Sequence, residues 1–150
     1  MGLIADLGRG RIGVDTAIFI YFMEENPRFL PLVEPLFEEV AAGRREVVTS
    51  ALTLLEVLVV PYRAQNADLA ERYQDLLTGS RGIAVVDLSR GQLRIAAQLR
   101  AATGVKTPDA LQLAAALGAG CMTFVTNDRR IPLIRGMRVL QLGDYESAIE

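Results

Sequence analysis

The sequence predicts an α/β fold: a three-layer α/β/α sandwich with a mostly parallel central sheet. Short runs of β-type residues alternate along the chain with longer runs of helical periodicity. Parallel strands need a long crossover between them, so helices should cover both faces of the sheet. The chain has 150 residues, of which 51% are hydrophobic, and this is enough for one core. We therefore expect a single domain over residues 1–150.

Five strands and six helices are predicted along the chain. The strands are expected at 12–14, 46–48, 83–86, 122–125 and 139–142, and the helices at 16–25, 31–42, 51–60, 66–78, 89–103 and 108–119. Ser50, Ser89 and Thr107 precede helical runs and are expected to cap them. Pro61 is expected to end the third helix, and Pro35 disfavours the second.

The composition excludes several kinds of chemistry. The chain has no histidine and one cysteine, Cys121, which lies in an apolar run where a buried, inert thiol is expected. No zinc cluster, disulfide framework or histidine-based triad is therefore available. The apolar run at 17–23 is shorter than the ~20 residues that a membrane span needs, and residues 1–11 do not resemble a secretory signal. A soluble, cytoplasmic protein whose chemistry depends on carboxylates is expected.

The charges are distributed unevenly along the chain. Residues 1–75 contain 12 acidic and 7 basic residues, and residues 76–150 contain 6 and 9. Fifteen of the sixteen basic residues are arginine, which binds phosphate in a bidentate manner more readily than lysine does. Phosphate contacts are expected from basic residues of the second half, chiefly Arg90, Arg94, Lys106, Arg129 and Arg130, with Arg81 and Arg100 in the same tract. Ordinary solvated arginines are the alternative interpretation.

Two carboxylates come directly after predicted strands. Asp15 follows the first strand, and Asp128 follows the fourth through Thr126 and Asn127. Ligands bind outside the carboxyl ends of strands in such sheets, so both acids are candidate ligands. The structural alternatives are a helix cap for Asp15 and a turn for Asp128, and Arg129 and Arg130 can pair with Asp128 or contact a phosphate.

Two further acids lie on predicted helices. Glu56 has mostly apolar neighbours at helical spacing, and a buried carboxylate is costly unless it is paired or binds a cation. Asp109 follows Thr107 and Pro108 at a helix start, where an acid also suits the helix dipole. Four converging carboxylates require a cation, and oxygen-only ligands favour Mg²⁺ or Mn²⁺.

Four segments carry a resemblance to a known family: VDT at 14–16, LTLLEV at 52–57, TPDALQLAAAL at 107–117 and TND at 126–128. In order and spacing they resemble the PIN-domain nucleases, over residues 12–142. The likeness is greatest to the VapC-like branch, the toxin halves of bacterial and archaeal toxin–antitoxin pairs, through TPDALQLAAAL and the ending TFVTNDRRI…GMRVLQL. Residues 1–11 exceed the usual start of the family and are interpreted as an N-terminal extension.

The resemblance implies a PIN-like fold and an endoribonuclease that cleaves single-stranded RNA with a water activated by Mg²⁺ or Mn²⁺. It places the catalytic and metal-binding cluster at Asp15, Glu56, Asp109 and Asp128, with Thr16, Thr126 and Asn127 in support. It also implies a type II toxin–antitoxin system, a cognate antitoxin and a homodimer. Two residues depart from the pattern: Ala17 replaces a polar residue, and Arg130 replaces another acid, which leaves open whether one or two ions bind.

Other interpretations of the sequence are weaker. GRGRIG at 8–13 matches a dinucleotide-binding pattern, but the predicted strand follows the glycines instead of preceding them. A phosphoacceptor receiver domain needs a lysine at a later strand end, and the only lysine, Lys106, precedes a helix. The main alternative is a catalytically silent PIN-like module that binds RNA or a protein partner. Retention of all four acids argues against it.

Overall fold

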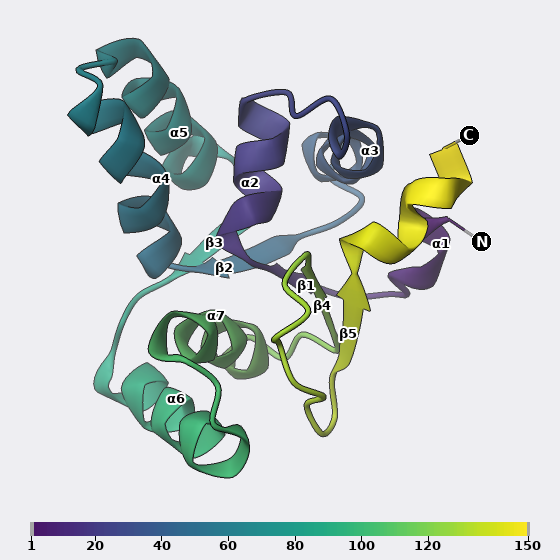
Figure 1. Cartoon of the computed structure of the whole chain (residues 1–150), viewed down its shortest axis with the longest axis vertical. Helices are drawn as coiled ribbons and strands as arrows, with labels where there is room; N and C mark the ends of the chain where they lie inside the picture. Colours follow the sequence, from purple (N-terminus) through teal and green to yellow (C-terminus); the bar gives the residue numbers. More distant parts are fainter. Residues whose placement is uncertain (1, 150) are drawn as a thin grey trace.

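Five parallel strands form one central sheet in the computed structural model, which describes residues 2–149 (Figure 1). The strands lie side by side in the order β3-β2-β1-β4-β5, and every neighbouring pair is parallel. They are β1 (Ile12–Val14), β2 (Val47–Ser50), β3 (Ile83–Val86), β4 (Thr123–Thr126) and β5 (Arg138–Gln141). The predicted α/β fold is confirmed, and the sheet is parallel throughout.

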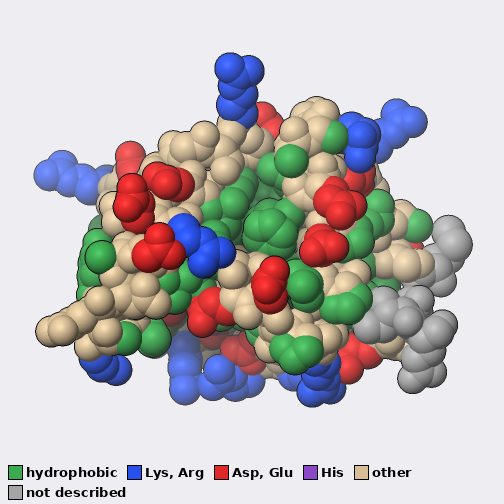
Figure 2. Space-filling model, turned by 90° about the horizontal axis from the view of Figure 1, so that it is seen from above, with side chains coloured by type: hydrophobic (Ala, Val, Ile, Leu, Met, Phe, Trp, Pro, Cys, Tyr) green, Lys and Arg blue, Asp and Glu red, His purple; other side chains and the backbone are tan. Residues whose placement is uncertain are grey.

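Helices cover both faces of this sheet. In Figure 1, α2, α3, α4 and α5 lie above the sheet, and α6 and α7 lie below it. Figure 2 shows the upper face, where acidic and hydrophobic side chains are interspersed and basic side chains lie mainly at the edge. The main helices are α2 (Thr16–Met23), α3 (Leu30–Ala41), α4 (Leu52–Arg63), α5 (Ala67–Gly79), α6 (Arg90–Thr103) and α7 (Thr107–Gly118).

The two faces of the sheet carry separate hydrophobic cores. In β2, Val47 packs in the core on the side of α2 and α3, whereas Val48 packs in the core that contains α7. Val125 and Phe124 of β4 divide between the two cores in the same way. Successive side chains of a strand point to opposite faces, so strands covered on both faces appear as uninterrupted apolar runs in the sequence.

Gly13 allows α7 to approach β1 closely. A Cβ atom at this position would lie 2.5 Å from Cβ of Ala116 and 2.9 Å from Cδ1 of Phe124. Both neighbours are buried, so neither has space into which to move. The missing side chain thereby lets α7, which carries Asp109 in its first turn, pack against the strand that ends just before Asp15.

The prediction that Pro61 ends the third helix is wrong, because α4 continues to Arg63. Proline removes only one backbone donor, and its φ angle is compatible with a helix. The helix then closes through the bond from the Ala64 N–H to the Val60 carbonyl, of 3.0 Å. Pro35 likewise lies inside α3, which forms despite it.

The predicted caps agree with the structure in part. Ser89 caps α6 by accepting a backbone N–H bond of 3.2 Å, as predicted. The caps of α4 and α7 are Ala51 and Lys106, each one residue from the predicted Ser50 and Thr107. Helix ends depend on the local path of the chain, so single-residue shifts of this kind are expected.

The two ends of the chain pack on the domain as short elements that were not predicted: α1 (Leu3–Asp6) and the 3₁₀ helix η1 (Leu142–Ile149), side by side in Figure 1. Leu7 is completely buried, and the Tyr145 hydroxyl donates a 2.8 Å hydrogen bond to Asp6. Residues 3–7 of the predicted extension therefore contribute to the core. Over residues 2–149, the helices are all too short or too polar to cross a membrane.

Candidate active site

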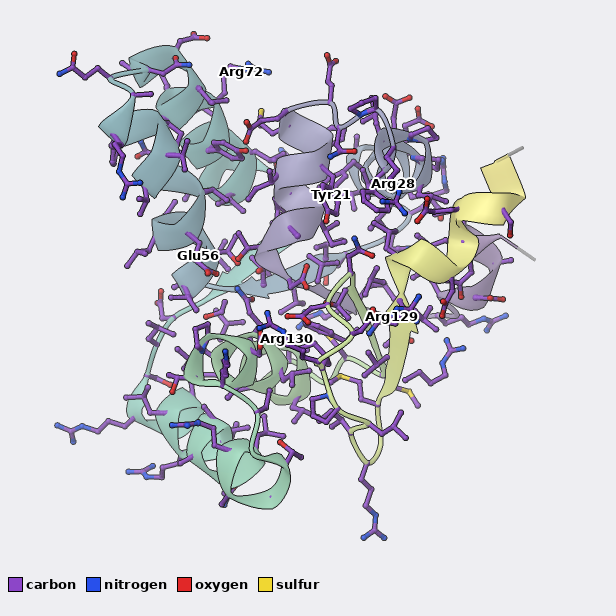
Figure 3. The ribbon with its side chains drawn as sticks, viewed as in Figure 1. Tyr21, Arg28, Glu56, Arg72, Arg129 and Arg130 are labelled. Carbon is purple, nitrogen blue, oxygen red and sulfur yellow. The ribbon has the colours of Figure 1, made fainter. Side chains whose placement is uncertain are left out.

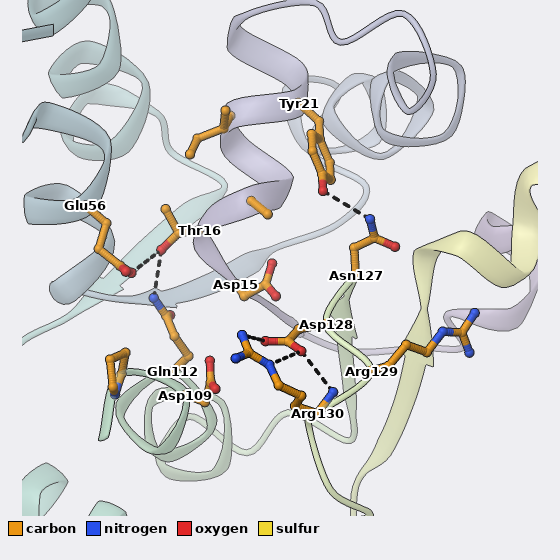
Figure 4. Close-up of a pocket in the computed structure, with 13 residues that line it drawn as sticks. Asp15, Thr16, Tyr21, Glu56, Asp109, Gln112, Asn127, Asp128, Arg129 and Arg130 are labelled. Carbon is orange, nitrogen blue, oxygen red and sulfur yellow. Dashed lines mark hydrogen bonds and ion pairs between the residues drawn. The ribbon is translucent and has the colours of Figure 1, made fainter. Parts of the chain in front are cut away.

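An open cleft of about 600 Å³ lies at the carboxyl ends of β1 and β4 (Figure 4). The order of the strands reverses between β1 and β4, and such a switch point is where parallel α/β sheets bind ligands. All four predicted acids line this cleft, together with the supporting Thr16 and Asn127. The full lining is Asp15, Thr16, Ala17, Ile20, Tyr21, Glu56, Pro108, Asp109, Gln112, Asn127, Asp128, Arg129 and Arg130.

Asp15 lies between the end of β1 and the start of α2, at the N-cap position. Its side chain makes no capping hydrogen bond within residues 2–149, so helix capping does not explain why an aspartate occupies this position. The Thr126 hydroxyl instead donates a hydrogen bond to Oδ2, whereas the buried Oδ1 has no partner among the described residues. Burial, reinforced by the nearby charges of Asp109 and Asp128, raises the pKa of Asp15 to about 6.

Asp109 and Glu56 approach the cleft from α7 and α4. Burial and the charge of Asp128 raise the pKa of Asp109, and the charge of Glu56 adds to this effect. Glu56 accepts a 2.6 Å hydrogen bond from the hydroxyl of Thr16. The acids are thus close enough to repel one another, which is the electrostatic situation that a bound cation relieves.

Asp128 differs from the other acids because Arg130 neutralises it. The Arg130 guanidinium donates to both carboxylate oxygens, with Nε 3.0 Å from Oδ1 and Nη2 2.8 Å from Oδ2. The hydrogen bonds from Arg130 hold the pKa of Asp128 below its usual range. The loop is fixed further by a 3.0 Å bond from the Asp128 N–H to the Thr126 hydroxyl oxygen.

Sequence reasoning missed Gln112, whose side chain connects three elements beneath the cleft. Its amide nitrogen donates to the hydroxyls of Thr16 (3.0 Å) and Thr53 (2.8 Å), and its oxygen accepts from the Ser50 N–H (3.3 Å). Gln112 is 3% exposed, so these bonds satisfy an otherwise buried amide. The signal was present in the sequence, because Gln112 is the only polar side chain of α7 after Asp109.

Tyr21 is a second residue that was missed. Asn127 donates a 3.1 Å hydrogen bond to the Tyr21 hydroxyl, and both residues line the cleft. Figure 3 shows Tyr21 and Glu56 extending from α2 and α4 toward the loop that carries Arg129 and Arg130. A tyrosine in an apolar run such as AIFIYFM is normally a core residue, so the sequence offered no signal for it.

The predicted basic residues fall into two groups. Arg129 and Arg130 line the cleft, and Lys106 at the start of α7 is near enough for its charge to lower the pKa of Asp109 and Asp128. Arg90 and Arg94 are exposed on α6, which packs against α7, and they lie outside the cleft lining. Only the first group is positioned to meet a phosphate at the acids.

The cleft suits a hard divalent cation, although its acids are not drawn together around one. Across residues 2–149, no three acidic, cysteine or histidine side chains are close enough together to hold a single ion. Two features nevertheless fit Mg²⁺ or Mn²⁺: the available donors are all oxygens, and the buried Oδ1 of Asp15 lacks a partner among the described residues.

Comparisons with known proteins agree with this architecture. The model of the PIN domain family matches residues 12–136, whereas a comparison with curated proteins gives no match. A toxin–antitoxin complex from Klebsiella pneumoniae has a similar fold, with a TM-score of 0.65 and 19% identity over 89% of this chain and 98% of that chain.

Two further solved structures are similar in fold. For VapBC2 from Rickettsia felis bound to a promoter DNA fragment, the TM-score is 0.69 and the identity 16%, over 88% of this chain and 98% of that chain. For DNA-bound VapBC from Salmonella typhimurium, the TM-score is 0.60 and the identity 22%, over 89% of this chain and 99% of that chain. The predicted family is confirmed by the match over most of the chain: this protein belongs to the PIN domain family.

Proposed function

We propose that the protein is an endoribonuclease that uses Mg²⁺ or Mn²⁺ to cleave single-stranded RNA. The observation that carries the proposal is the presence of four carboxylates in the lining of one cleft, with one buried carboxylate oxygen left unpaired among the described residues. Such an arrangement is unfavourable for the empty fold, because like charges raise one another's pKa. A divalent cation would offset that repulsion, and all four acids would then serve to bind it.

Asp15, Glu56 and Asp109 would hold the cation through carboxylate oxygens or intervening waters, and Asp128, which is paired with Arg130, would do so through a water molecule. The bound ion would lower the pKa of a water molecule and neutralise charge on the reacting phosphate. The hydroxyl of Thr126 holds one oxygen of Asp15 in place.

Thr16 and Gln112 orient Glu56. Arg129, Arg130 and Lys106 surround the acids with positive charge, which lowers the repulsion between the cleft and the RNA backbone. Arg90 and Arg94 on α6 would contact a longer stretch of the strand. Asn127 would support the same side of the cleft through its hydrogen bond to the Tyr21 hydroxyl.

We further propose that the protein is the toxin of a type II toxin–antitoxin pair, acts in the cytoplasm, and forms a homodimer that binds a cognate antitoxin. Support comes from the similar folds found in toxin–antitoxin complexes. A short upstream reading frame that encodes a DNA-binding protein would strengthen this part of the proposal. Sequencing the flanking genomic region, followed by co-purification of the two products, tests it.

An RNase assay with and without EDTA tests the activity. Wild type should cleave single-stranded RNA with added Mg²⁺ or Mn²⁺ and lose this activity in EDTA. Asp15→Asn and Asp109→Asn should be inactive with an intact fold, whereas Asp75→Asn, which changes an exposed acid on α5, should cleave normally. Undiminished cleavage in EDTA, or by both site variants, would contradict the proposal. Binding of RNA without cleavage would favour the silent module.

A further inference from the structure

Arg130 already supplies a positive charge inside the acidic cleft. Besides its two side-chain bonds to Asp128, its backbone N–H donates to Oδ1 of the same carboxylate at 2.9 Å. Both oxygens of Asp128 are therefore occupied by one arginine. The carboxylate side chain is 24% exposed and the arginine side chain 70% exposed, so the pair forms part of the wall that faces solvent.

Asp15 has no such partner within residues 2–149, although it lies beside Asp128: the Thr126 hydroxyl donates to Asp15 and accepts a bond from the Asp128 N–H. Asp15 receives one hydroxyl bond, and its Oδ1 is buried and unpaired among these residues. Asp109 on α7 feels charges of both signs: Asp128 and Glu56 repel its charge, while Arg130 and Lys106 attract it. The need for a cation is thus greatest at Asp15 and least at Asp128.

A guanidinium that donates two parallel hydrogen bonds to one carboxylate places its positive charge at a defined position beside that carboxylate. Its planar fork matches a carboxylate, and it stays charged at every physiological pH. Two divalent ions in one nuclease site typically lie about 3.5–4 Å apart and need carboxylates free to bind both. At Asp128 the guanidinium takes up those oxygens, and its charge repels a second divalent ion nearby.

We propose that Arg130 takes the place of a second metal ion, so that the cleft binds one divalent cation per chain, at Asp15. The inference rests on the proposed function, since it concerns how the same acids are neutralised. It makes Arg130 a residue that determines metal stoichiometry. It also accounts for an arginine at a position where the family resemblance leads one to expect an acid.

Calorimetric titration of the EDTA-treated and dialysed full chain with MnCl₂ tests this stoichiometry. Wild type should bind one Mn²⁺ per chain. Arg130→Asp and Arg130→Gln should each bind two, because a repelling unit charge is lost and the oxygens of Asp128 become free. Arg129→Gln is the matched control, since the neighbouring arginine pairs with Asp144 at 2.5 Å and should leave the stoichiometry at one. Circular dichroism checks that each variant is folded.

Each outcome of the titration has a distinct meaning. Two ions bound to wild type would overturn the inference and leave the proposed function standing, and so would a single ion bound equally by wild type, Arg130→Asp and Arg130→Gln. No ion bound by wild type or by either Arg130 variant would overturn the metal dependence of the proposed function, and the inference with it. The wild-type count stands as a test even if a variant fails to fold.

Discussion

The hydroxyl of Thr126 at the end of β4 donates a hydrogen bond to Oδ2 of Asp15 at the end of β1. The residues are 111 positions apart in the chain and become neighbours because β1 and β4 pair in the sheet. The bond satisfies one oxygen of a buried carboxylate and leaves Oδ1 without a partner among residues 2–149. Thr126 thereby determines which oxygen of Asp15 is available to a ligand.

Replacing Thr126 by valine should raise the pKa of Asp15 above its value of about 6, because the hydroxyl bond lowers it. Loss of a bond to a charged group should also cost about 1.5–3 kcal/mol of unfolding free energy at pH 8. Carbon-detected NMR titration of the Asp15 carboxyl and urea unfolding measure the two effects. Thr126→Ser keeps the hydroxyl and should resemble wild type. A valine variant whose Asp15 titrates as in wild type would show that the bond has no such role.

Asp15→Asn should stabilise the metal-free protein at pH 8 and not at pH 3.5. Burial raises the pKa of Asp15 from 3.8 to about 6, so the folded state prefers the protonated form. The stability that this residue contributes in its protonated form is present below pH 4 and is lost as the pH rises through 6. Asparagine carries no charge and avoids the loss, which amounts to up to about 3 kcal/mol.

Urea unfolding in EDTA at the two pH values measures this difference for wild type, Asp15→Asn and the exposed control Asp75→Asn. The gain should appear only in Asp15→Asn, and it should be present at pH 8 and absent at pH 3.5. An equal gain at pH 3.5 and pH 8 would mean that the charge of Asp15 is not what destabilises the empty cleft.

Gln112→Ala should destabilise the fold by about 2–3 kcal/mol, because it leaves buried polar groups unsatisfied and opens a small cavity. Cleavage should fall as well, since the Thr16 hydroxyl that orients Glu56 loses its amide partner. Gln98→Ala on the exposed side of α6 is the control and should change stability by less than about 0.5 kcal/mol. Thermal unfolding and the RNase assay give both readouts. Equal melting temperatures for the two variants would contradict this role of Gln112.

The cleavage products should carry 5′-phosphate and 3′-hydroxyl ends. The chain has no histidine to act as the base for attack by the ribose 2′-hydroxyl, so water is the expected nucleophile. Mass spectrometry of the products from a short synthetic RNA distinguishes the two routes, with heat-inactivated protein as the control. Products that end in a 2′,3′-cyclic phosphate would rule out the proposed chemistry.

Much of the architecture was predictable because its signals are local. All five strands lie within one or two residues of their predicted positions, and Asp15, Glu56, Asp109 and Asp128 line one cleft as expected. The helices α1 and η1 were not predicted: α1 has only four residues, and η1 is a 3₁₀ helix, which lacks the 3.6-residue period of an α-helix. Gln112 stands out in the sequence as a lone polar residue of an apolar helix, but its role was missed because its partners Thr16, Ser50 and Thr53 are far from it in the chain.

The sequence by itself determined the order of the elements, the family and which four acids would line one cleft, because periodicity and motif spacing are properties of the linear chain. Only the tertiary structure decided how those acids are paired. Arg129 and Arg130 are adjacent and of the same type, yet Arg130 turns back to Asp128 whereas Arg129 reaches Asp144, fifteen residues further along the chain. The direction of each side chain depends on the path of the loop after β4 and on the segment packed beside it, and neither is encoded in residue spacing.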